Sequence, residues 1–127
     1  MRLVLIRHAE AAPGDPDELR ALTPTGQEQA RLLGERLRAD GVVADAVLTS
    51  PLLRARETAA ALGFGEPQPL DELGPGATAD GVREAIAGRG DTVVVVGHQP
   101  DCSVVTAALR GGAEPAFPPA GVQIVEL

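Results

Sequence analysis

A run of five β-branched residues constrains the fold of this chain more than any other feature. Residues 92–96 have the sequence Thr-Val-Val-Val-Val, which is β-branched throughout. A strand that is apolar on both faces must be covered on both sides, as a central strand of a parallel sheet is. The run therefore predicts an α/β fold in which helices cover both faces of a sheet.

The remaining sequence alternates between strand and helix patterns, which supports the same architecture. Thr23-Pro24 predicts an N-cap followed by a proline in the first helical turn, and residues 25–28 fit a capping box. Ser50-Pro51 predicts a second helix start of the same kind. We expect strands at residues 3–6, 46–49, 92–96 and 121–127, the last at a sheet edge, and helices at 25–39, 50–61, 78–87 and 100–110. The pattern predicts one domain, residues 1–127, folded as a three-layer α/β/α sandwich with a mostly parallel central sheet.

Composition excludes some classes of function. The formal net charge is −7, and the chain has two Phe and no Trp or Tyr, which disfavours nucleic-acid binding because neither a basic surface nor stacking platforms are present. Cys102 is the single cysteine, so no internal disulfide can form, and we expect a small buried thiol in a reducing compartment. No signal-like or membrane-spanning apolar stretch is present. We therefore expect a cytoplasmic monomer without membrane contacts.

Basic side chains follow three of the predicted strands. Arg7 and His8 end the first, Arg54 lies one turn beyond the second, and His98 follows the third. Ligands of open α/β sheets bind at the carboxyl ends of the strands, where these residues should meet. A single histidine after a strand is usually an ordinary polar residue, but both histidines of the chain together with two arginines indicate an anion site.

The chemistry of this set suits phosphoryl transfer. Planar guanidinium groups match the oxygens of a phosphoryl group. One neutral imidazole can attack phosphorus to form a phosphohistidine, while the second donates a hydrogen bond to the same group. No metal-binding or nucleotide-binding motif is present, so we expect neither a metal nor a cofactor.

At these residues the sequence resembles the histidine phosphatase superfamily, which includes the cofactor-dependent phosphoglycerate mutases. The resemblance is carried by Arg7-His8-Ala9, Ser50-Pro-Leu-Leu-Arg54-Ala-Arg-Glu-Thr58-Ala, Val96-Gly97-His98 and Leu22-Thr-Pro-Thr-Gly26. Within the superfamily the chain is most similar to the short phosphohistidine phosphatases of the SixA type. That similarity rests on the length and on Gly97-His98-Gln-Pro-Asp101, Arg20-Ala-Leu-Thr23 and Phe117-Pro-Pro-Ala-Gly121-Val122.

The resemblance implies a phosphoglycerate-mutase-like fold and assigns roles to the basic residues. His8 would be the nucleophile, and Arg7, Arg54 and His98 would complete the phosphate pocket. Arg20 would reach the pocket in the SixA-type subgroup, although a solvated loop residue is the alternative. Ala9 stands where the family has glycine, which matters if that position requires a positive φ.

The proton donor is the open part of the assignment. Larger members of the family use a carboxylate from an inserted segment, whereas here Asp71, Glu72 and Glu10 are the candidates. An alkoxide leaving group needs a proton, but phosphohistidine can leave as neutral imidazole when its other nitrogen is protonated. This favours a phosphohistidine-bearing protein as substrate. The alternatives are a phosphatase of small phosphate monoesters and a catalytically inactive phosphate-binding module; a mutase is disfavoured.

Overall fold

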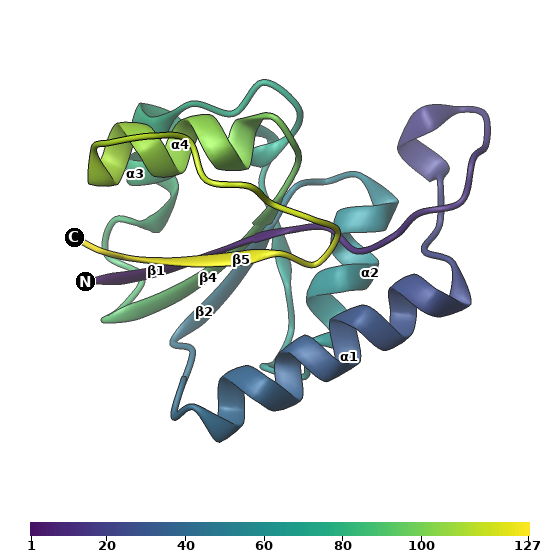
Figure 1. The fold of residues 1–127 in the computed structure, drawn as a ribbon, viewed down its shortest axis with the longest axis horizontal. Coiled ribbons are helices and arrows are strands. Elements are labelled where there is room, and N and C mark those ends of the chain that lie inside the picture. Colours follow the sequence, from purple (N-terminus) through teal and green to yellow (C-terminus); the bar gives the residue numbers. More distant parts are fainter.

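A computed structural model describes all residues, 1–127, as one five-stranded sheet between two layers of helices (Figure 1). The strands are β1 (Arg2–Arg7), β2 (Ala46–Thr49), β3 (Gln68–Pro69), β4 (Thr92–Gly97) and β5 (Val122–Glu126). The helices are α1 (Pro24–Ala39), α2 (Leu53–Ala61), α3 (Ala79–Ile86) and α4 (Asp101–Arg110), with 3₁₀ turns η1 (Asp17–Leu19) and η2 (Asp71–Leu73).

The sheet confirms the predicted topology. Its strand order is β3-β2-β4-β1-β5, so the valine-rich strand β4 is the middle one. The β1–β4, β2–β4 and β2–β3 pairs are parallel, and only β5 runs antiparallel, at the edge beside β1. The four valines of β4 are at most 1% exposed, as a strand covered on both faces requires. The chain therefore forms the expected three-layer α/β/α sandwich.

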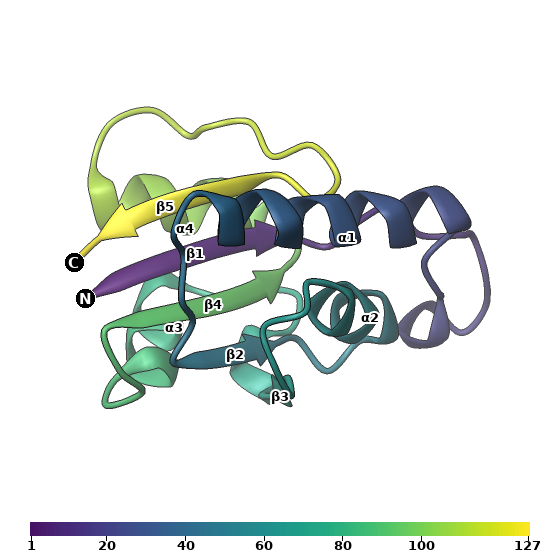
Figure 2. The ribbon, with the colours of Figure 1, turned by 90° about the horizontal axis from the view of Figure 1, so that it is seen from below.

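Two apolar clusters fill the space between the sheet and its helices. Because successive strand residues point to opposite faces, Val93 and Val95 pack toward α3 and α4, while Val94 and Val96 pack toward α1 and α2. Figure 2 shows β4 between its neighbours, with α1 and α2 covering the near face. Leucine, valine and alanine side chains supply most of both clusters, which the near-absence of aromatic residues requires.

The helix starts differ in part from the sequence expectation. Thr23 is the N-cap of α1, and its hydroxyl accepts a hydrogen bond from the Gly26 amide at 2.9 Å. The prediction of a capping box at residues 25–28 is wrong, because those residues already lie inside the helix. The second helix begins at Leu53 rather than at Ser50, because Pro51 and Leu52 form a bend before it.

The strand register brings the functional end of the sheet together. Arg7 pairs with Gly97 in the β1–β4 ladder, and Thr49 pairs with Val96 in the β2–β4 ladder. The residues that follow β1, β2 and β4 therefore emerge side by side at one edge. Among the helices, none combines the length and apolar character that crossing a bilayer requires.

Candidate active site

Hydrogen bonds of ordinary length fix the segment after β1. The His8 amide donates to the Gly97 carbonyl at 2.9 Å, and the Ala9 amide donates to the Thr58 hydroxyl at 3.0 Å. Thr58, fully buried in α2, in turn donates to the carbonyl of Arg54 at 2.8 Å. The end of β1 is thus tied both to β4 and to the helix that carries Arg54, so little backbone freedom is left at His8.

The His8 ring is held in one tautomer. Its Nδ1 lies 2.7 Å from the carbonyl oxygen of Ala9. A carbonyl only accepts hydrogen bonds, so Nδ1 carries the ring proton and Nε2 keeps its lone pair. Burial lowers the pKa of His8 below 6.5, and the charges of Arg54, Arg7 and Arg20 lower it further. At neutral pH the ring is therefore a neutral imidazole with a free nucleophilic nitrogen.

His98 lies beside His8 at the end of β4. The two ring centroids are 5.3 Å apart and the ring planes are inclined by 59°, so one phosphoryl group can contact both. The Nε2 of His98 is 2.7 Å from the Ser50 hydroxyl, which also accepts from the Leu52 amide at 3.2 Å. Ser50, which the sequence predicts as a helix cap, instead orients His98. Burial, together with His8 and Arg54, lowers the pKa of His98 to about 4.

Two guanidinium groups, one buried on Arg54 and one partly buried on Arg7, complete the inner part of the site. Arg7 Nη1 donates to the Phe117 carbonyl at 3.0 Å, and Arg54 Nη1 donates to the Asp17 carbonyl at 2.9 Å. The Nε–H of each arginine is buried and has no acceptor in the protein. A buried donor without an acceptor is unfavourable, and phosphoryl oxygens are suitable acceptors. Both groups therefore fit an anion-binding pocket.

Arg20 and Asp17 form the outer rim. Arg20 donates from Nε to the Ala12 carbonyl at 2.8 Å and from Nη1 to the Asp17 carboxylate at 3.1 Å. Its charge is among those that lower the pKa of His8, so Arg20 lies close enough to act on that ring, while contact with a phosphoryl group stays a prediction. Asp17 was not predicted. It lies among several acidic residues of one loop, and nothing in the sequence distinguishes it from them.

The comparisons with known proteins agree with this geometry. A model of the histidine phosphatase superfamily (branch 1) matches residues 3–74. The chain belongs to the histidine phosphatase superfamily. It is 36% identical over 137 residues to an uncharacterised protein of Mycobacterium tuberculosis, an alignment that covers 96% of this chain and 87% of that protein.

Solved structures of the superfamily have the same fold. The structure of the protein histidine phosphatase SixA complexed with tungstate superposes with a TM-score of 0.92 and 30% identity, covering 100% of this chain and 88% of that one. A phosphoserine phosphatase mutant from Entamoeba histolytica has a TM-score of 0.76 at 18% identity and covers 97% and 89%, which shows the shared fold alone. This member of the histidine phosphatase superfamily is thus a phosphatase with a SixA-like structure.

The three candidate proton donors lie in other surroundings. The Glu10 carboxylate accepts from the Thr23 hydroxyl at 2.6 Å, where it helps to fix the start of α1. Asp71 and Glu72 are exposed residues of the turn η2 after β3, at the same end of the sheet as the site. No hydrogen bond joins any of the three to His8 or His98. The role of these three residues as proton donors therefore stays a prediction.

Ala9 causes no strain in place of the family's glycine. The backbone φ of Ala9 is not positive, because Ala120 is the sole non-glycine residue with a positive φ. The Ala9 side chain is completely buried and packs with Leu22 and Ala30. The extra methyl group is therefore accommodated in the core beneath the site.

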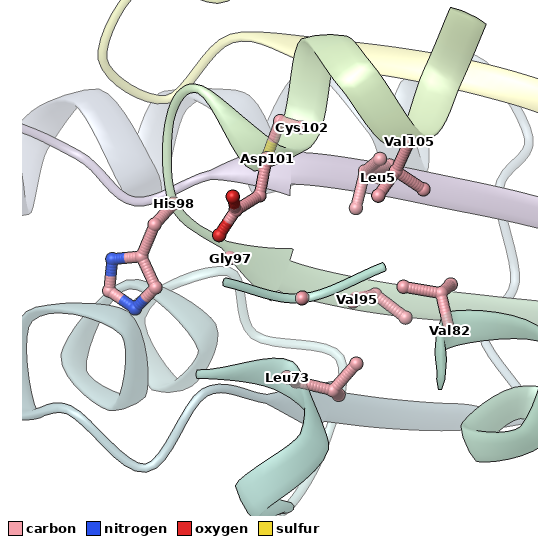
Figure 3. A pocket seen from close by; sticks show the side chains of 10 residues that line it. Leu5, Leu73, Val82, Val95, Gly97, His98, Asp101, Cys102 and Val105 are labelled. Atoms are coloured by element: carbon pink, nitrogen blue, oxygen red, sulfur yellow. The ribbon is translucent and has the colours of Figure 1, made fainter. Parts of the chain in front are cut away.

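A small apolar cavity lies behind His98. Its volume is about 10 Å³, which is no more than one water molecule needs, and its lining includes Leu73, Val82 and Cys102. Figure 3 shows the His98 ring directed away from these side chains. Burial raises the pKa of Cys102 to about 12, which makes this thiol the inert core residue that the sequence predicts. This cavity is too small to bind a substrate, and its apolar lining makes the surroundings behind His98 nonpolar.

The lowered histidine pKa values predict a loss of stability in acid. The folded state binds a proton on His98 with a pKa of about 4, whereas an unfolded histidine has a pKa of about 6.5. Stability is thus fully present above pH 6.5 and falls as the pH drops toward 4, by about 3 kcal/mol from His98. Ring-proton NMR titration checks this directly, because the chain has only two histidines. Titration of both rings at or above pH 6.5 would contradict it.

Proposed function

We propose that this phosphatase removes phosphoryl groups from histidine side chains of a protein, through a covalent intermediate on His8. The observation that carries the proposal is the pattern of hydrogen bonds at His8 and Asp17. His8 offers a neutral Nε2 beside Arg7 and Arg54, whereas the one carboxylate bonded into the site, Asp17, is held ionised. Hydrogen bonds from Arg20 and then Arg54 lower the pKa of Asp17. A site with a ready nucleophile and no acid hydrogen-bonded to it suits a leaving group that needs no proton.

Each step follows from these positions. The Nε2 lone pair of His8 attacks phosphorus, and the bond between phosphorus and the substrate imidazole breaks, with its electrons returning to that nitrogen. The imidazole leaves neutral because its second nitrogen already carries a proton. Water then attacks phosphorus, the bond to His8 Nε2 breaks, and the water proton leaves with phosphate and solvent. Arg7, Arg54 and His98 stabilise the charge on the three phosphoryl oxygens in both steps.

A protein substrate fits the open architecture. The connections that bear the site are short, with three residues between β2 and α2 and three between β4 and α4. The loop with η1, the turn η2 and the segment that leads into β5 stand at this end of the sheet, and no inserted helix layer covers it (Figure 1). The similarity to SixA, whose structure was obtained with the oxyanion tungstate, supports both the pocket and the class of substrate.

Phosphate release distinguishes the proposal from its alternatives. A histidine-phosphorylated protein, prepared by chemical phosphorylation, is compared with a phosphoserine peptide and with small sugar phosphates. We expect kcat/KM for phosphohistidine to exceed that for the monoesters by at least about 100-fold, because an unprotonated alkoxide is a poor leaving group. Faster hydrolysis of the monoesters would establish the small-molecule alternative. Release of phosphate from none of them would indicate a phosphate-binding module.

A further inference from the structure

Asp17 holds an unusual position between the buried pocket and solvent. Arg54 Nη2 donates to one of its carboxylate oxygens at 3.1 Å, and Arg20 Nη1 donates to the other at 3.1 Å. The side chain of Arg54 is 8% exposed, whereas that of Asp17 is 61% exposed. Of the five N–H groups of Arg54, two contact Asp17, so three stay available for a phosphoryl group. Asp17 therefore shares Arg54 with the substrate rather than blocking it.

The leaving group must pass close to this carboxylate. In phosphoryl transfer the nucleophile and the leaving group lie on opposite sides of phosphorus. His8 approaches from the end of the sheet, so the group that carries the phosphoryl points outward, toward the loop with η1. Both Figure 1 and Figure 2 show this loop beyond the carboxyl ends of the strands. The charge of Asp17 also opposes the lowering of the His98 pKa, as a nearby group would.

The charges of the site match a phosphoryl dianion alone. Arg7, Arg20 and Arg54 carry three positive charges and Asp17 one negative charge, while His8 and His98 are neutral at pH 7. The resulting two positive charges balance a phosphoryl group of charge −1.5 to −2. A second negative group on the carrier would find no free cation and would face the Asp17 carboxylate.

We propose that Asp17 determines specificity, by repelling carriers with a negative charge beside the phosphoryl group and accepting a hydrogen bond from carriers with an N–H, such as an imidazole ring. This inference rests on the proposed function, because it concerns the leaving group of the same site. It explains why an exposed acidic side chain is held at the mouth of a pocket that binds anions. Replacement of the carboxylate by an amide removes the charge but leaves the contact between Arg54 and the backbone carbonyl of residue 17.

Binding of two non-hydrolysable ligands tests the proposal without requiring turnover. The ligands are 4-carboxyphenylphosphonate and 4-carbamoylphenylphosphonate, which have nearly the same shape and differ by one negative charge. Calorimetry on the full chain should give a Kd about tenfold lower for the carbamoyl ligand, as repulsion between partly solvated charges predicts. Asp17→Asn should reduce this ratio to about one, and Asp17→Glu should restore most of it. Raising the salt concentration should weaken the preference of the unmodified protein.

A neighbouring acid provides the matched control. Glu18 lies in the same turn, and its side chain has no ion-pair partner, so Glu18→Gln removes one charge from the loop without changing the rim. This variant should keep the tenfold ratio. An unchanged ratio in Asp17→Asn, or equal weakening of both ligands, would show a merely structural role and overturn the proposal. Failure of the unmodified protein to bind either phosphonate would also overturn it, whereas binding with the expected ratio but no phosphate release would refute the proposed function alone.

Discussion

His8→Asn is expected to lower kcat for phosphohistidine hydrolysis by about 10⁴-fold while leaving the fold intact, because removal of a nucleophile eliminates the covalent route. The amide of asparagine can still donate a hydrogen bond toward the Ala9 carbonyl, which His8 Nδ1 contacts at 2.7 Å. The phosphate pocket made by Arg7 and Arg54 is retained. Single-turnover phosphate release, together with thermal unfolding of the variant, measures both parts of the prediction.

The second histidine gives an informative contrast. His98→Ala removes one hydrogen-bond donor to the phosphoryl group but leaves the nucleophile, so kcat should fall by about 10²- to 10³-fold. Activity near the unmodified level in His8→Asn would exclude His8 as the nucleophile. A larger loss of kcat in His98→Ala than in His8→Asn would exchange the two proposed roles.

Gly34→Ala is expected to destabilise the protein by about 3 kcal/mol, which corresponds to a fall in Tm of about 10 °C. Gly34 lies in α1 where this helix crosses the end of α2. A Cβ at this position would overlap the Leu62 carbonyl oxygen and lie 2.8 Å from the carbonyl carbon. Backbone atoms cannot rotate away as a side chain can, so the two helices must separate. Their separation also weakens the contact of the Arg38 guanidinium with the same carbonyl.

Gly14→Ala is the matched control for this effect. A Cβ on Gly14 would meet no atom closer than the Arg20 side chain at 3.6 Å, and its φ suits any residue. The substitution should change the free energy of unfolding by less than about 1 kcal/mol. Urea unfolding of both variants measures these changes in the free energy of unfolding. Equal stability of Gly34→Ala and the unmodified protein would mean that α1 and α2 are not packed as closely as the structure has them.

The fold could be predicted from the sequence because each strong pattern reflects burial. The β-branched residues 92–96 require cover on both faces, and the alternation of strands and helices leaves few other arrangements. Helix starts were less predictable. Pro51 follows a serine as Pro24 follows a threonine, yet only Thr23 caps a helix, because the Ser50 hydroxyl is used by His98 and by the Leu52 amide.

The residues of the inner site could be predicted, whereas Asp17 at the rim could not. Arg7, His8, Arg54 and His98 follow strand ends, and the parallel topology alone brings such residues together. Asp17 enters the site only through the path of the long loop between β1 and α1. That path depends on contacts of Arg54 and Arg20, which no local pattern records.

The covalent intermediate on His8 is the central claim, and a rapid-quench experiment tests it most directly. The protein is mixed with a histidine-phosphorylated substrate that carries a labelled phosphoryl group, quenched in alkaline denaturant during the first turnover, and mapped by mass spectrometry. Alkaline conditions are needed because acid hydrolyses phosphohistidine. We expect the label on the peptide that contains His8, appearing before free phosphate. Release of phosphate in the first turnover with no label on His8 would contradict the account.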